Sequence, residues 1–219
     1  MKTNFLEFAQ DILIEALFQT LYMVLISTVL ATIVGFILAI TLVITDEKGL
    51  RPNKSINNVL GVIVNTVRSF PFIILIVSII PLTRLIVGKA IGVNAALVPL
   101  TIGASPFVAR IIEGALKEVD KGLIEAAKSF GASDFQIIFK VMIKEAMPSI
   151  VSGITLSTIS ILGYTAMAGA VGAGGIGAVA LTYGYQKFDT SVMLYTVCTL
   201  IILVQLIQCI GNLAYKRLK

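Results

Sequence analysis

The sequence contains no histidine and no tryptophan, only two cysteines, and only 13% charged residues among 219. Without histidine it lacks the side chain most often used as a general base and as a metal ligand. Cys198 and Cys209 are eleven residues apart in one apolar stretch, about three turns of a helix, which is too far for a disulfide. No G-x-x-x-x-G-K-[ST] run is present, so the chain has no P-loop with which to bind ATP. We therefore expect no catalytic residues, no metal site and no cofactor.

Hydrophobic residues, in contrast, make up 57% of the chain, against about 45–50% in soluble domains. Several windows without charge are as long as the roughly 20 residues that cross a bilayer as a helix. The sequence therefore predicts an all-α polytopic membrane protein, with residues 1–219 forming one transmembrane domain and Met1–Glu15 a short interfacial helix. The five expected spans are residues 17–45, 57–81, 90–109, 146–168 and 190–213.

The distribution of lysine and arginine predicts the orientation of these spans. Twelve of these residues fall in the loop after the first span, the segment 110–145 and the C-terminal tail, whereas four fall on the opposite side. Basic residues in short loops mark the cytoplasmic side of a membrane protein. We therefore expect an extracytoplasmic N-terminus and a cytoplasmic C-terminus, and we attribute the net charge of +5 to this bias, not to binding of nucleic acid.

The cytoplasmic segment 110–145 is the only substantial part of the chain expected outside the bilayer. Asp120 can cap a helix of about three turns, and Gly131 can end that helix in the left-handed conformation. Ser133 and Gln136 then match the S-x-x-Q capping box, which begins a new helix. The pattern predicts helix, sharp break, helix. Such a segment either receives a push from a soluble partner or rests on the membrane surface as an ordinary loop helix.

One motif in this segment favours the first alternative. The run Glu125-Ala126-Ala127, followed by Gly131 and by Ile143 and Pro148, resembles the EAA motif of ABC importer permeases. The resemblance implies a type I ABC importer permease fold and a coupling helix seated in a cleft of a separate ATPase subunit. It also implies that this subunit contacts Glu125, Ala126, Ala127, Ser129 and Gly131. Met147 stands where many members carry leucine, a change that conserves volume.

Longer stretches narrow the resemblance to methionine-uptake permeases, which are similar in length and in their five spans. These stretches are residues 65–75, 81–88, 163–167 and 169–177. The resemblance implies an importer of methionine in the bacterial cytoplasmic membrane, with L-methionine and D-methionine as its candidate substrates. Its implied partners are two copies of an ABC ATPase and an extracytoplasmic methionine-binding lipoprotein. Five helices make a thin wall for a pathway, so we expect a homodimer. Another small apolar amino acid remains an alternative substrate.

Three residues are candidates for the pathway or its gate. Tyr164 and Met167 lie just before the glycine-rich run, and their alternative role is helix packing. Arg68 is the only charge flanked on both sides by membrane-length sequence, and its alternative is to extend toward the inner interface. The run Gly172-x-Gly174-x-x-Gly177 formally matches a dinucleotide fingerprint, but no strand precedes it. It is better explained as a turn or a place of close packing.

Other classes of membrane protein fit less well. A proton-driven carrier commonly has acidic or histidine residues within its spans, whereas here all twelve acidic residues lie outside the windows. A sodium-coupled carrier often has internal repeats, and we find none. A structural subunit would not need the capped cytoplasmic segment. A membrane enzyme would need a constellation of nucleophile and base that the sequence does not provide.

Overall fold

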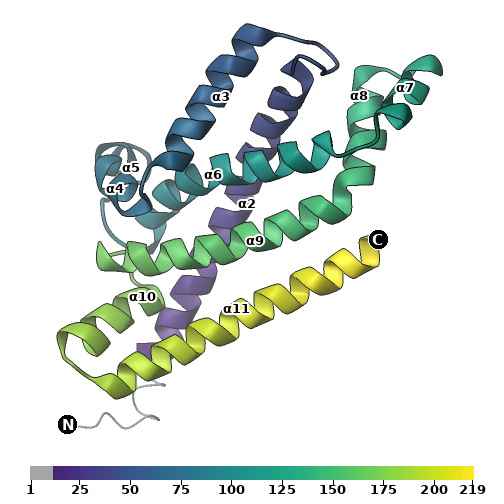
Figure 1. Cartoon of the computed structure of the whole chain (residues 1–219). Coiled ribbons are helices and arrows are strands. Elements are labelled where there is room, and N and C mark those ends of the chain that lie inside the picture. Colours follow the sequence, from purple (N-terminus) through teal and green to yellow (C-terminus); the bar gives the residue numbers. More distant parts are fainter. Residues whose placement is uncertain (1–11) are drawn as a thin grey trace.

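The computed structural model describes residues 12–219, and every regular element in that range is helical, which confirms the all-α class. The interfacial helix predicted for Met1–Glu15 falls mostly outside the described residues. Two π-helical turns, η2 (Ile137–Met142) and η3 (Ala180–Gln186), accompany ten helices in this range (Figure 1). The helices are α2 (Ile14–Thr45), α3 (Lys54–Ser69), α4 (Phe72–Ser78), α5 (Ile80–Val87), α6 (Val93–Lys117), α7 (Lys121–Ser129), α8 (Asp134–Gln136), α9 (Ile143–Ala170), α10 (Gly175–Val179) and α11 (Thr190–Leu218).

Within residues 12–219, four helical stretches are long and apolar enough to cross a membrane: α2, α6, the continuous run from α8 to α9, and α11. The second expected span, residues 57–81, is not one straight helix. It is broken between α3 and α4, which are bent by 105° to each other. Proline disfavours helical geometry in the preceding residue, and Phe70, which precedes Pro71, has extended backbone. The pair α3–α4 is therefore either a broken span or a re-entrant loop.

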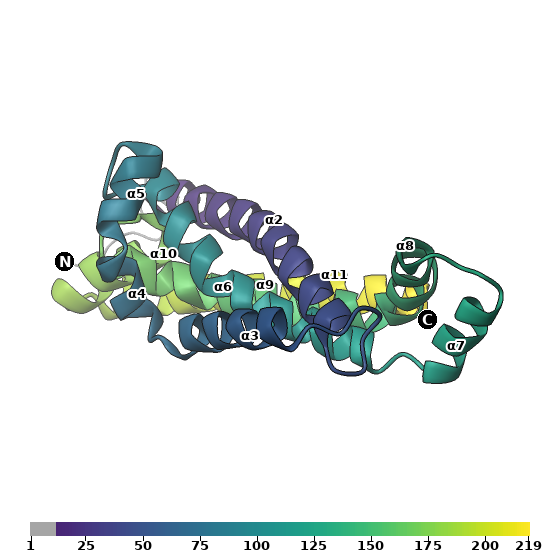
Figure 2. The ribbon, with the colours of Figure 1, turned by 90° about the horizontal axis from the view of Figure 1, so that it is seen from above.

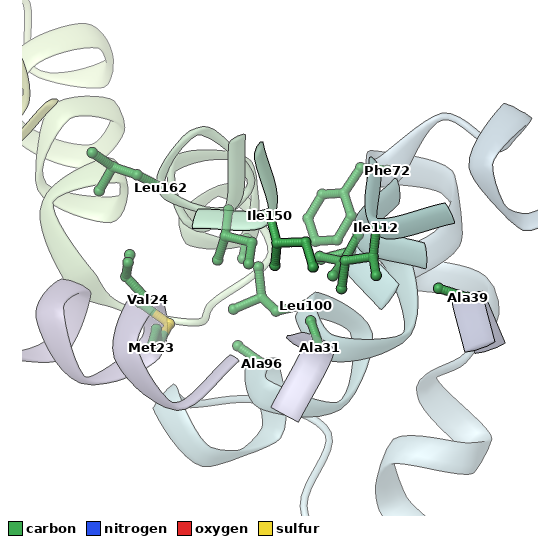
Figure 3. Close-up of a cluster of buried hydrophobic side chains, with 14 of the residues drawn as sticks. Met23, Val24, Ala31, Ala39, Phe72, Ala96, Leu100, Ile112, Ile150 and Leu162 are labelled. Carbon is green, nitrogen blue, oxygen red and sulfur yellow. The ribbon is translucent and has the colours of Figure 1, made fainter. Parts of the chain in front are cut away.

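The core lies where α2, α6 and α9 pack together (Figure 1). In the close-up of Figure 3, Leu100 of α6 lies between Ala31 of α2 and Ile150 of α9, next to Ala96 of its own helix. A Cβ atom built on Gly35 would come within 2.8 Å of the Val108 side chain, so α2 and α6 cross with no room for a larger residue. Small residues at such crossings allow the close helix packing on which membrane proteins depend.

The glycine-rich run forms the turn between α9 and α10. A Cβ atom at Gly177 would meet the Ala166 backbone at 2.4 Å, so the two helices touch there through their main chains. The first N–H groups of α10 are capped from α2: Gly175 N–H donates to Gln19 Oε1 at 2.8 Å and Ile176 N–H to Thr20 Oγ1 at 2.9 Å. The interpretation of this run as a packed turn is confirmed, and the N-terminal end of α2 is fixed to it.

Candidate functional site

The helix predicted after Asp120 is α7, and both of its predicted ends are confirmed. The Asp120 carboxylate accepts a hydrogen bond from Gly122 N–H at 2.6 Å, which caps the first turn. The helix ends at Ser129, and Gly131 follows with φ of 77°, a left-handed conformation that other residues adopt at a cost. Figure 2 shows α7 set off from the helix bundle at one end of the molecule. It is a short rigid element with a sharp stop.

The capping box predicted at the next helix start is also present. Ser133 Oγ accepts from Gln136 N–H at 3.3 Å, and Gln136 Oε1 accepts from Ser133 N–H at 2.9 Å. From Asp134 the chain then runs without a break through α8, η2 and α9 to Ala170, a helical stretch of 37 residues. The structure thus connects α7, across one glycine stop, to a continuous helical stretch that bends near η2 and then reaches the glycine-rich turn at the opposite end (Figure 1).

Only one side of α7 contacts the rest of the chain. Ile124 and Ala127 are half-buried against the core, whereas Glu125, Ala126 and Ser129 are exposed. The residues of the EAA-like run therefore divide between two faces: Ala127 packs against its own chain, and its two predecessors face outward. None of the nine residues of α7 is fully buried, so the helix offers most of its surface to a partner.

The residue directly after α7 was not among the sequence candidates. Phe130 is 91% exposed, the most exposed of the large hydrophobic side chains in the described part of the chain. At this end of the molecule it follows a helix with three exposed charged residues, Lys121, Glu125 and Lys128, so its surroundings are polar and its exposure is not explained by lipid contact. The sequence did contain a signal for Phe130, because it is an aromatic residue in a charged segment, immediately before Gly131 ends the helix.

A cavity of about 250 Å³ separates α7 from the loop that follows α2. Lys121, Ile124 and Lys128 form its wall on α7. Gly49, Leu50 and Met142 lie among the residues opposite. Close-packed interiors contain few voids larger than a water molecule. The space beneath α7 therefore leaves this helix less tightly packed than the core, although Ile124 and Ala127 still contact it.

A charged network at the end of α6 holds the same region together from the other side. Glu113 is buried, with an exposed fraction of 6%, and its two oxygens contact Arg110 Nη1 at 2.7 Å and Lys117 Nζ at 2.9 Å. Lys117 also contacts Asp46 Oδ2 at 2.7 Å, and Arg110 donates to Asn65 Oδ1 at 2.9 Å. The network joins α6 to the loop after α2 and to α3. The hydrogen bond that Lys117 donates to the Asp46 carboxylate holds the pKa of Asp46 below the ordinary value of 3.8.

The structure does not gather the three pathway candidates into one site. The Tyr164 ring stacks on Phe72 of α4, with ring centres 4.5 Å apart, so it contributes to packing beside the α3–α4 bend. Met167 is 48% exposed. Arg68 is exposed in the last turn of α3, next to the bend.

Comparison with known proteins also indicates a membrane transport protein. The family model for the inner membrane component of binding-protein-dependent transport systems matches residues 31–219. The chain is 53% identical over 173 residues to the probable D-methionine transport system permease protein MetI of Vibrio cholerae, covering 79% of this chain and 77% of that protein. It is 48% identical over 172 residues to the methionine import system permease protein MetP of Bacillus subtilis, covering 78% of each.

Solved structures are similar over almost the whole chain. A structure of the MetNI methionine ABC transporter in an inward-facing conformation matches with a TM-score of 0.94 and 42% identity, covering 95% of this chain and 96% of that one. An amino acid ABC transporter crystallised with histidines matches with a TM-score of 0.79 at 21% identity, which supports the fold alone.

Proposed function

The chain belongs to the family of inner membrane components of binding-protein-dependent transport systems, and from this premise we propose that it is the membrane-spanning permease of an ATP-driven methionine importer. The observation that carries the proposal is the likeness, over 95% of the chain, to the permease fold of a methionine ABC transporter. The chain is a multi-pass membrane protein and a permease subunit, and ATP hydrolysis is performed by a separate chain.

We place the contact with the ATPase on α7. Glu125, Ala126 and Ser129 present the exposed face, and Gly131 fixes the angle at which the helix ends. Ala127 acts from the other face, where it keeps α7 against the permease. Closure of the ATPase subunits would tilt α7 over the space beneath it and move the bent helical stretch from α8 to α9. Such closure shifts the permease between inward- and outward-facing states only if the contacts of α7 differ in free energy between them.

We propose that two copies of the chain form the pathway. Beyond Lys54 and Ser55 in its first turn, α3 carries five more exposed polar residues, although it belongs to a segment of membrane length: Asn58, Asn65, Thr66, Arg68 and Ser69. Polar and charged side chains at membrane depth face the interior of a bundle or water, not lipid. A second copy, related by a two-fold axis, would enclose this face of α3, and Arg68, Tyr164 and Met167 are our candidates for the pathway or its gate.

An extracytoplasmic methionine-binding protein completes the proposed system, because the family is defined by dependence on such proteins. ATP-dependent uptake of labelled methionine into vesicles containing the permease, the ATPase and the binding protein tests the whole proposal. Uptake that requires all three supports it. Accumulation of another amino acid would replace methionine as substrate, and uptake by the permease alone would favour a secondary carrier.

Phe130 is expected to anchor the ATPase. Full burial of a phenylalanine side chain is worth roughly 1.5–3 kcal/mol, so Phe130→Ala should weaken the affinity of the ATPase about tenfold or more. The measurement is the affinity of the purified ATPase for the permease in nanodiscs. Phe188→Ala is the matched control, since Phe188 is 86% exposed beyond η3, at the end of the molecule opposite α7. Equal affinities for the wild type and the Phe130 variant would contradict the prediction.

The proposed orientation makes a second prediction. The C-terminal end of α11 lies at the same end of the molecule as α7 and α8 (Figures 1 and 2), so both should be cytoplasmic. A reporter fused after Lys219 should be active in the cytoplasm, and one inserted between Lys187 and Phe188 should be active outside. An extracytoplasmic signal from the Lys219 fusion would contradict the proposed orientation.

A further inference from the structure

A second cavity, of about 200 Å³, lies at the opposite end of the molecule from α7. Its walls come from the α4–α5 pair, from the first turns of α6 and from the turn between α9 and α10. Ile76, Ile80, Ala95, Ala96 and Ala173 make most of the lining apolar. The volume is below the roughly 300–1,000 Å³ typical of sites for drug-sized ligands, which restricts an occupant to something as small as one amino acid.

Two polar residues of α5 also line this cavity. Thr83 is 3% exposed, and its buried hydroxyl has no hydrogen-bond partner among residues 12–219. Most buried polar side-chain atoms in native structures have such a partner, so an orphaned hydroxyl at a cavity wall indicates a ligand or an ordered water. Arg84 is its neighbour in the chain, with an exposed side chain that forms no ion pair among residues 12–219.

The N-terminus of α6 opens into the same cavity. Gly92 is the N-cap residue of this 25-residue helix, and no side chain of the described part of the chain caps it. The free N–H groups and the dipole at a helix N-terminus favour an anion. An uncapped helix N-terminus, a guanidinium group and an orphaned hydroxyl thus converge, and each of them favours a carboxylate.

No acidic residue of the described chain serves this site. Glu15, at the same end of the molecule, accepts a hydrogen bond from Gln19, and Asp189 caps α11 through Ser191 and Val192. A cation in the last turn of α5 does interact favourably with that helix dipole. That interaction would explain the position of Arg84 but not the unpartnered Thr83 hydroxyl beside it.

We propose that this cavity is a binding site for the transported amino acid on the extracytoplasmic side of the permease. The α-carboxylate is bound by Arg84, by the Thr83 hydroxyl and by the N-terminus of α6, while the apolar side chain lies against Ile76, Ile80 and Ala95. The inference rests on the proposed function, because it takes an apolar amino acid as the substrate. It assigns the first contact of that substrate with the permease after its release from the binding protein.

Binding of labelled L-methionine to the permease–ATPase complex in nanodiscs, without the binding protein, tests the site. Hydrogen bonds to charged groups contribute about 1.5–3 kcal/mol, so Arg84→Gln should weaken binding at least about tenfold. Thr83→Val should also weaken binding, whereas Thr83→Ser should restore it. Lys89→Gln is the matched control, because it removes a cation of the same surface that does not line the cavity. Methionine amide, which lacks the carboxylate, should not compete.

The outcomes separate this site from the proposed function. Methionine uptake by the complete wild-type system tests the function, and failure there rejects the importer itself. If the wild type transports methionine but shows no saturable binding without the binding protein, the site is rejected and the function stands. The same holds if Arg84→Gln binds methionine normally. Arg84→Gln could also weaken only the affinity of the permease for the binding protein and leave methionine binding unchanged. In that case Arg84 pairs with a carboxylate of the binding protein, and the proposal is overturned.

Discussion

Replacing Ala126 by arginine is expected to abolish ATP-driven methionine uptake while the permease still folds and inserts. Ala126 is exposed on α7, so the new side chain meets no atom of its own core. Exposed substitutions of this kind usually change the free energy of unfolding by no more than about 0.5 kcal/mol. In the proposed complex, however, the same position faces the ATPase, where the small alanine side chain permits close approach.

The expected size of the effect follows from the chemistry of interfaces. Substitutions of hot-spot residues near the centre of an interface cost about 2 kcal/mol or more, which corresponds to a roughly 30-fold weaker affinity. Arginine adds both bulk and an unpaired charge there. We therefore expect that Ala126→Arg no longer co-purifies with the ATPase, and that its uptake falls to the level seen without ATP.

Ala126→Ser is the matched control, because serine is small and neutral and should retain both association and uptake. Membrane abundance and thermal unfolding of the two variants should be equal. If Ala126→Arg binds the ATPase with the affinity of the wild type, α7 is not the coupling helix, and the docking surface must lie elsewhere on the cytoplasmic end.

The sequence alone predicted the features that depend on local signals. Asp120, Gly131 and the Ser133–Gln136 box each act within three residues, so their roles could be recognised without knowledge of the fold, and all are confirmed. The apolar windows identified four membrane-length helices for the same reason, since length and hydropathy are properties of the window itself.

The features that were missed depend on geometry. The windows record charge, so they did not detect the 105° bend at Pro71, although the proline was a local signal for it. The cavity beside Thr83 brings together α4, α5, α6 and the α9–α10 turn, and no spacing in the sequence indicates that arrangement. Arg110, Glu113 and Lys117 do have helical spacing, but the burial of Glu113 and its link to the loop after α2 require the tertiary structure.

The second large effect is expected at Glu113. Glu113→Ala leaves Arg110 and Lys117 without their shared carboxylate at the packed end of α6. Removal of one member of a buried ion pair typically costs about 3–5 kcal/mol, because the remaining charge is desolvated and unpaired. Arg110 and Lys117 keep Asn65 and Asp46 as partners and are partly exposed, so we expect the lower part of this range. Thermal unfolding of the purified permease measures the loss.

Glu118→Ala is the matched control, since it removes the same charge one turn later from an exposed side chain that forms no ion pair among residues 12–219. It should leave the unfolding temperature nearly unchanged. Glu113→Gln, which keeps the size and some hydrogen bonds, should fall between the two. An equal loss for the Glu113 and Glu118 variants would show that the loss reflects net charge and not the buried network.

The pH dependence distinguishes the network from packing at the same position. The bond from Lys117 lowers the pKa of Asp46, so its stabilising contribution is complete above the unfolded value of 3.8 and is lost only as the pH falls through the lower folded value. Titration of Asp46 should therefore leave the unfolding temperature of the wild type unchanged from roughly pH 5 to 8. In Asp46→Asn the acid-induced loss due to this residue should disappear. An unchanged acid transition in that variant would show that the Asp46–Lys117 pair does not stabilise the end of α6.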